Sequence, residues 1–294
     1  MKEVVAQRAV ASTYALAEGP VWDAVNDRLL WVDITAGDVH EGRLRGDTIE
    51  PAAARHIDRT VGAVALADGR DLLVAGHHAV YLVSEDGPLT TVAGLIDADE
   101  QRRLNDGKCD PAGRFLVGTL ALGDQVRETL YQIDARTGAH VVDDDLQMSN
   151  GLGWAPDGHT MYSVDTTPGI VFRREYDPAT GRHGSREKAF RVSDGSPDGL
   201  CVDTEGNIWL AVWGTGQVRR YSPGGDLLAV VHVGAPYTSC VTFAGAGLDR
   251  LVISTAIDDL SAEERAAHPD SGALFLADVD ARGLPTTSWR TTTH

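Results

Sequence analysis

Short apolar cores recur along the chain at a nearly constant spacing. They begin at residues 29, 72, 115, 161, 208 and 251 and read LLWV, LLVA, FLVG, MYSV, IWLA and LVIS. Most of them follow a turn signal such as Asp68-Gly69 or Asp157-Gly158, residue types that tolerate left-handed backbone angles in tight hairpins. Each core is therefore expected to be the second strand of a hairpin.

A third strand is expected after each core, and a glycine-containing turn closes most of these strands. A repeat of about 44 residues holds four short strands and their turns, and a period in the forties is typical of propeller blades. The pattern predicts an all-β chain: one six-bladed β-propeller domain over residues 1–294, with four antiparallel strands per blade. Two sandwich domains of roughly 150 residues also fit the length, but six equal periods without a linker argue against them.

Closure of the ring needs a strand from the start of the chain. An open array would leave unpaired edges on its first and last blades, and such edges promote aggregation. The segment 3–10 (EVVAQRAV) has the pattern of a strand. It is expected to form the outer strand of the last blade.

The composition is that of a globular enzyme, with 43% hydrophobic and 23% charged residues. No apolar run approaches the ~18 residues of a membrane helix, and no basic segment leads into an apolar stretch as in a secretory signal. These features favour a cytoplasmic protein without a membrane span. The net charge of −17 makes nucleic acids and anionic membranes poor partners.

Several other chemistries find no support in the sequence. There is no GxSxG, HExxH, EF-hand or Walker motif. Cys109, Cys201 and Cys240 lack CxxC spacing and fall in or near expected innermost strands, so buried free thiols are predicted. The adjacent His77 and His78 are expected to point to opposite faces of a strand end and to form no metal site.

The openings of the first strands carry the candidate chemistry. In a propeller these strands line the central axis, so equivalent positions of successive blades converge. Asn-Gly and Asp-Gly pairs are common turn dipeptides, yet each blade already has a hairpin turn about seven residues later, so a functional role is favoured. The six openings are Glu18-Gly19, Val61-Gly62, Asn105-Asp106-Gly107, Asn150-Gly151, Asp198-Gly199 and Ser239-Cys240.

Glu18, Asn150 and Asp198 would bring two carboxylates and one amide oxygen to the axis. Hard oxygen donors of this kind suit Ca²⁺, Mg²⁺ or Mn²⁺. A bound cation would also relieve the repulsion between the two carboxylates, and three protein ligands leave coordination positions open for catalysis.

Four motifs carry a resemblance to a known family. They are AEGPVWD from residue 17, RLNDGKCDPAGRFLVGT from 103, SNGLGWAPDGHTMYSVD from 149 and PDGLCVDTEGNIWLA from 197. The chain resembles the senescence marker protein, gluconolactonase and luciferin-regenerating enzyme family over nearly its whole length. The resemblance implies a six-bladed propeller, a sugar lactone as substrate and one catalytic divalent ion, with Ca, Zn, Mn, Mg and Fe as candidates.

The resemblance also implies roles for individual residues. Glu18, Asn150 and Asp198 would hold the metal, and Arg103 and Asn105 would bind substrate oxygens. Some sugar-lactonase relatives carry an acidic substrate contact after the third-blade Gly-Thr, whereas this chain has Ala-Leu-Gly before Asp124. Asp124 replaces that contact only if the loop is shifted, so the resemblance does not identify which sugar lactone is the substrate.

The expected reaction is opening of the lactone ring by water. The metal would polarise the carbonyl, and Asp198 would deprotonate or orient the water. A non-catalytic calcium-binding propeller and an ester or organophosphate hydrolase remain alternatives. A protein-interaction propeller ranks below them, because aromatic residues make up only 6% of the chain.

Overall fold

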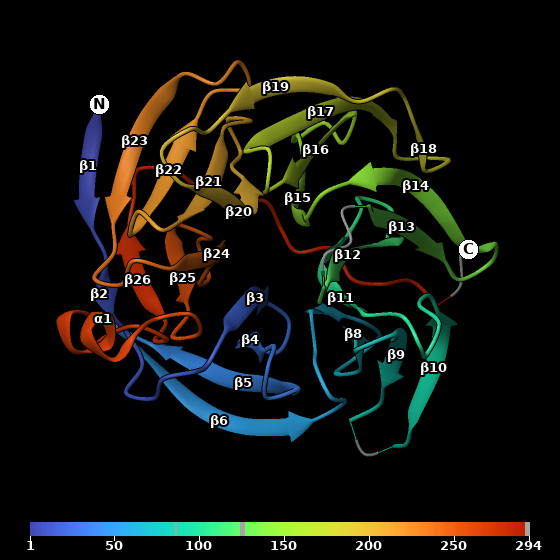
Figure 1. Cartoon of the computed structure of the whole chain (residues 1–294), viewed down its shortest axis with the longest axis horizontal. Helices are drawn as coiled ribbons and strands as arrows, with labels where there is room; N and C mark the ends of the chain where they lie inside the picture. The colour runs from blue at the N-terminus through green and yellow to red at the C-terminus, as the bar shows by residue number, and fades with distance from the viewer. Residues whose placement is uncertain (86, 124–126, 292–294) are drawn as a thin grey trace.

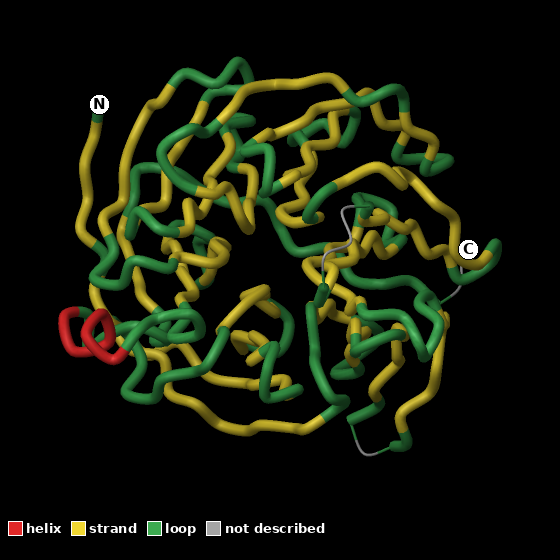
Figure 2. Tube along the Cα trace, in the orientation of Figure 1, coloured by secondary structure: helices red, strands yellow, loops and turns green. Residues whose placement is uncertain are grey.

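Six small antiparallel sheets surround a central axis in the computed structural model, which describes residues 1–85, 87–123 and 127–291 (Figures 1 and 2). This arrangement confirms the six-bladed propeller. Blade 1 holds β3 (Ala17–Asp23), β4 (Arg28–Asp33), β5 (Asp38–Arg45) and β6 (Thr48–His56), and blade 2 holds β7 (Ala63–Leu66), β8 (Leu72–Ala75), β9 (Ala79–Val83) and β10 (Leu89–Gly94). Blade 3 holds β11 (Arg102–Cys109), β12 (Phe115–Ala121), β13 (Glu128–Asp134) and β14 (Gly138–Leu146).

The second half of the chain repeats the plan with small additions. Blade 4 holds β15 (Ser149–Trp154), β16 (Thr160–Asp165), β17 (Ile170–Asp177) and β19 (Glu187–Arg191), and the two-residue β18 (Arg182–His183) pairs antiparallel with the end of β17. Blade 5 holds β20 (Ser196–Val202), β21 (Ile208–Trp213), β22 (Gln217–Tyr221) and β23 (Leu227–His232). Blade 6 holds β24 (Thr238–Ala244), β25 (Arg250–Thr255) and β26 (Phe275–Asp278).

The N-terminal segment closes the ring, but it serves two blades instead of one. Only β2 (Gln7–Arg8) is the outer strand of blade 6, where it pairs with β26. The preceding β1 (Lys2–Val5) runs parallel to β23 and adds a fifth strand to blade 5. Ala6 is buried between the two pairings and its N–H donates to His232 O, so the chain changes blades at this residue.

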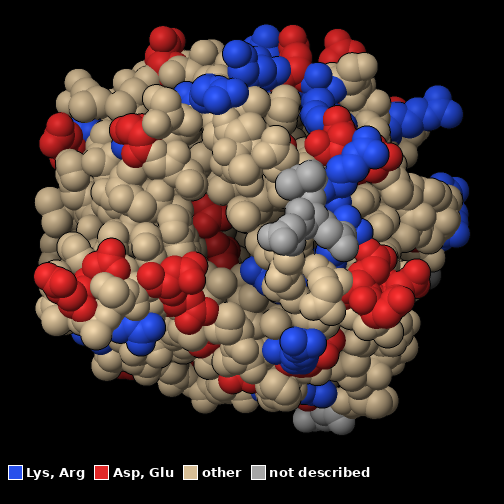
Figure 3. Space-filling model, viewed as in Figure 1, with Lys and Arg blue, Asp and Glu red and all other residues tan. Residues whose placement is uncertain are grey.

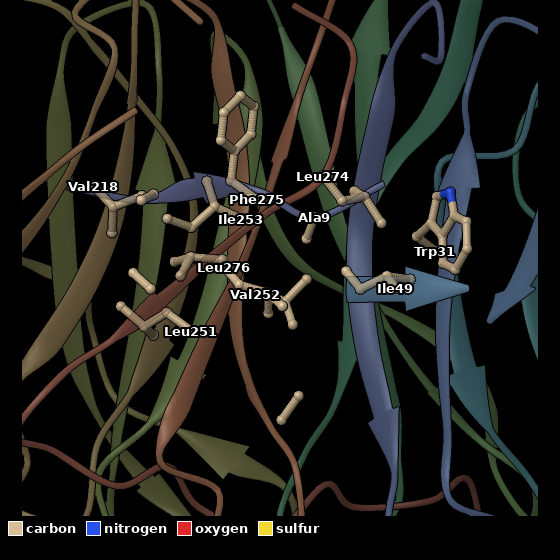
Figure 4. Packing of buried hydrophobic residues seen from close by; sticks show 14 of the residues in the cluster. Ala9, Trp31, Ile49, Val218, Leu251, Val252, Ile253, Leu274, Phe275 and Leu276 are labelled. Carbon is tan, nitrogen blue, oxygen red and sulfur yellow. The ribbon is translucent and has the colours of Figure 1, made fainter. Parts of the chain in front are cut away.

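The apolar residues of the strands pack between the blades. Among the described residues, each hydrophobic cluster joins neighbouring blades, and the largest cluster joins blades 5, 6 and 1. Figure 4 shows Ile253 and Leu276 of blade 6 in this cluster, with Trp31 and Ile49 of blade 1 nearby. The blades are thus held together by side chains that project from both faces of each sheet.

A short helix interrupts the β structure. The segment between β25 and β26 forms α1 (Ala262–Ala267), which begins with a capping box of Ser261 and Glu264 and has no buried residue. It is a surface addition. No helix in the described parts of the chain is long and apolar enough to cross a membrane.

The residues after β26 form a strap, residues 279–291, that crosses several blades. Its residues 284–287 line a cavity of about 350 Å³ together with the ends of inner strands, including Lys108, Trp154 and Cys201. The strap therefore covers one end of the axial channel. Gly283 forms a β-bridge with Asp203 of blade 5. The strap also donates hydrogen bonds from Thr286 Oγ1 to Trp22 O of blade 1, from Trp289 N to Leu66 O of blade 2, and from Arg290 N to Gly113 O of blade 3.

Candidate active site

The openings of five inner strands are β-bulges. The strand register shifts between Glu18 and Val21, between Asn150 and Leu152, between Pro197 and Leu200, and equivalently in β11 and β24. The inner strand of blade 2, β7, pairs regularly and carries no polar group at its opening. Because a bulge adds an unpaired residue and re-aims side chains, it accounts for polar groups turned to the axis.

Glycines at these openings let the inner strands approach one another closely. A Cβ on Gly62 would lie 2.5 Å from Asn105 O and 2.6 Å from Leu104 O on the next blade. Added Cβ atoms on Gly151 and Gly199 would likewise clash with Asp198 O and Cys240 Sγ. The inner strands can therefore lie this close at the axis only because glycine has no side chain at these positions.

The Asn150 amide is held in one orientation. Thr166 donates its hydroxyl hydrogen to Pro197 O at 2.8 Å, so it can only accept from Asn150, whose Nδ2 lies 2.8 Å away. The Oδ1 atom of Asn150 then faces Asn105, which donates to it through Nδ2 at 2.9 Å. An amide oxygen has two lone pairs, and one remains for a cation.

Asn105 links the two groups of predicted site residues. Its Nδ2 donates to Ser149 O at 2.7 Å as well as to Asn150, and its Oδ1 accepts from Arg103 Nη1 at 2.7 Å. Both amide hydrogens of Asn105 are therefore used within the protein. Asn105 positions Arg103 and Asn150, and has one oxygen lone pair left for a substrate.

Three buried carboxyl groups gather at the axis. Burial and the charge of Asp106 raise the pKa of Glu18 to about 8, although the Gly19 N–H donates to this carboxylate at 2.7 Å. Burial, together with the charges of Glu18 and Asp106, raises the pKa of Asp198 well above its usual value. Asp106 is itself buried and its pKa is also raised. Ionised carboxylates would repel one another here without screening by water, so the site without a cation favours their protonated forms.

Two cationic side chains offset part of this charge. Burial lowers the pKa of Arg103 to about 10, and Glu18 and Asp198 oppose that change. The Nζ of Lys108 donates to Leu200 O at 2.7 Å, and its charge lowers the pKa of Asp106. Figure 3 shows Asp and Glu atoms within a central hollow and Lys or Arg atoms at its edge.

The donor set fits a hard divalent cation. In the described parts of the chain, no three His, Cys, Asp or Glu side chains form a metal-type cluster, so a third donor must be of another kind. The fixed amide oxygen of Asn150 is such a donor. Burial and the charges of neighbouring carboxyl groups raise the pKa values of Glu18 and Asp198, and a bound cation would offset both effects.

The structure adds Asp106, Lys108 and Thr166 to the predicted site. Asp106 stands in the third opening beside Asn105, and that position was the only signal for it. The second and sixth openings have structural roles. In the sixth opening, Ser239 Oγ donates to Ala17 O of blade 1 at 2.6 Å. Asp124 lies outside the described residues.

The cysteines are free thiols, as predicted, with Cys109 and Cys240 buried and Cys201 half-buried. Burial raises the pKa of Cys201 to about 12, and it raises the pKa of Cys240 well above its usual value, with the Glu18 charge adding to the effect. They are protonated packing residues at neutral pH.

Comparisons with known proteins agree with this architecture. A 6-deoxy-6-sulfogluconolactonase of Pseudomonas putida is 33% identical over 273 residues, covering 91% of this chain and 92% of the relative. Regucalcin of Xenopus laevis is 29% identical over 303 residues, covering 98% and 99%. The solved structure of regucalcin from Agrobacterium tumefaciens, named as a calcium-binding protein, has a TM-score of 0.92 at 26% identity, with 98% of both chains covered.

A family model described as the SMP-30/Gluconolactonase/LRE-like region matches residues 16–257, which include all five predicted site residues. The match confirms the resemblance seen in the four motifs. The chain belongs to the SMP-30/gluconolactonase/LRE-like family.

Proposed function

We propose that this protein is a lactonase that uses one divalent metal ion to open a sugar lactone to the sugar acid. The observation that carries the proposal is the charge interaction between the buried carboxyl groups of Glu18 and Asp198, with the oriented Asn150 amide on the neighbouring inner strand. Relatives named as lactonases support the reaction class. The calcium-binding name of the regucalcin neighbour supports a divalent ion.

Glu18, Asn150 and Asp198 would hold the metal through oxygen atoms. When bound, the ion would supply a Lewis acid that polarises the lactone carbonyl. Oxygen donors favour Ca²⁺, Mg²⁺ or Mn²⁺ over softer ions, and Zn²⁺ and Fe²⁺ stay in the test set.

The chain's own residues would arrange the substrate and the water. Arg103 offers its Nε and Nη2 atoms, which have no hydrogen-bond partner in the described parts of the chain, and would bind substrate oxygens while Asn105 holds its Nη1. Asp198 would be ionised beside the cation, and it would orient the attacking water and accept its proton.

The experiment is acid release from a panel of aldonolactones such as glucono-, galactono- and arabinonolactone. The protein is stripped of metal, and single divalent ions are then restored. Turnover should be lost on stripping and return with particular ions. Background rates for every lactone with every ion would contradict the proposal, and ion binding without turnover would instead favour a non-catalytic calcium-binding propeller.

Asp198→Asn tests the centre of the site. This variant should keep its fold, measured by circular dichroism and thermal unfolding, while turnover falls by at least about 100-fold, the scale of general-base catalysis. A matched control is Asp194→Asn, which changes a carboxylate bound to Arg219 away from the axis. Near-normal activity of Asp198→Asn would show that the catalytic centre lies elsewhere.

A further inference from the structure

His77 and His78 lie in the turn between β8 and β9. The expectation that they point to opposite faces of a strand is wrong, because the turn lets the two rings stack with centroids 4.3 Å apart and planes at 29°. His77 is 8% exposed. A buried histidine in a turn at the substrate end of a blade needs an explanation.

Three hydrogen bonds fix His77 beside the substrate-binding strand. Its ring atom Nδ1 lies 2.8 Å from Thr60 Oγ1, and its backbone N–H donates to Asp58 Oδ2 at 2.9 Å. Its carbonyl accepts from Leu104 N at 2.9 Å, directly next to Arg103. The imidazole is therefore held at the joint between blades 2 and 3.

The open nitrogen of His77 is Nε2. It has no hydrogen-bond partner among residues 1–85, 87–123 and 127–291. It is also not fully buried, so it is accessible to solvent. Burial lowers the pKa of His77, and the charges of His78, Arg59 and Arg103 add to the effect. The ring is thus a neutral group close to the guanidinium of Arg103.

The place of blade 2 in the propeller decides which part of a substrate His77 can reach. Asp198, the proposed base, is on blade 5, and blade 2 stands opposite to it in a six-membered ring. A lactone with its carbonyl near Asp198 and its far side across the axis would bring its other atoms toward Arg103 and His77. A neutral imidazole nitrogen can donate to or accept from a hydroxyl group.

We infer that His77, held by Thr60, binds a substrate hydroxyl remote from the lactone carbonyl and so makes the site selective for hydroxylated lactones. This inference rests on the proposed function and adds a specificity-determining residue to it. A site that hydrogen-bonds a hydroxyl discriminates against the analogue without it, because its polar group is then left unpaired.

The test compares glucono-δ-lactone with δ-valerolactone, which has the same ring and no hydroxyl groups. His77→Phe keeps an aromatic ring for stacking on His78 and removes both nitrogens. It should lower kcat/KM for gluconolactone roughly three- to tenfold, mainly through KM, as for the loss of one neutral hydrogen bond. The value for δ-valerolactone should stay within about twofold of the wild type.

Two further variants separate recognition from folding. His159→Phe changes a histidine in the turn between β15 and β16, remote from the opening that carries Asn150, and should alter neither lactone. Thr60→Val frees the imidazole but keeps its nitrogens, so it should give a smaller selective loss. If the His77→Phe variant does not fold, Thr60→Val still tests the role of His77.

Each outcome has a separate meaning. An equal loss for both lactones, or no loss for either, would overturn the role of His77 while wild-type turnover upheld the proposed function. Absence of wild-type turnover of every lactone would overturn the proposed function and this inference with it.

Discussion

Gly62→Ala should damage the site although Gly62 contacts no substrate. Its new Cβ would lie 2.5 Å from Asn105 O and 2.6 Å from Leu104 O, against ordinary contacts of 3.4–4 Å. The two inner strands must separate by about 0.9 Å, the difference between 3.4 and 2.5 Å. The backbone of Gly62 does not need a positive φ, so the expected effect is steric.

The expected cost is about 1–3 kcal/mol of unfolding free energy, as for other overpacked sites. Asn105 would move with its strand and carry Arg103 and Asn150 with it. A displacement of about 1 Å in a catalytic constellation can lower the rate on the order of 100-fold. Activity should therefore fall more than stability alone explains.

The assay combines urea unfolding, calorimetric titration with Ca²⁺ and lactone turnover. Gly94→Ala is the matched control, because Gly94 lies on the outer strand of the same blade and an added Cβ would meet nothing within 4 Å. The control should stay within about 0.5 kcal/mol of the wild type. If the two variants behave alike, close approach of the inner strands does not hold the site together.

Two more predictions concern charge and orientation. In metal-stripped protein the unfolding free energy should fall as the pH rises from about 5 to 8, because folded Glu18 keeps its proton up to about pH 8 and the unfolded chain loses it near 4.5; urea unfolding at several pH values checks this, and Glu18→Gln should flatten the profile. Asn105→Ala should weaken metal binding and turnover by about 10- to 100-fold, as for other residues that orient a metal ligand. Unchanged Ca²⁺ affinity in calorimetry would show that Asn150 keeps its orientation without Asn105.

The period of the apolar cores was enough to predict the architecture. Each apolar core can be recognised from its local sequence, and a ring of six equal blades is one of few arrangements that bury all six cores. The N-terminal closure was predicted only in part. A pattern such as EVVAQRAV marks a strand but does not show that the chain changes partners at Ala6.

The site was predicted less completely than the fold. The positions of Glu18, Asn150 and Asp198 followed from the period, but the bulges that turn them did not, since Asn-Gly and Asp-Gly pairs look the same in turns and in bulges. Asp106 was missed because alternation in a regular strand allows only one of two neighbours to face the axis. The network of Asn105 and Thr166 joins three consecutive blades through residues that lie 31 and 45 positions apart, and no local signal marks it.

Ring closure by β1 and β2 also bears on the synthesis of the chain. These residues leave the ribosome before any blade is made, yet their partners β23 and β26 belong to the last two blades. Blades 1 to 4 can pair from local sequence as they emerge, whereas blades 5 and 6 present open edges to other chains until the first residues return. β1 and β2 are thus made before the blades but are among the last elements to be fixed, and the nascent chain must keep them available while the blades are translated.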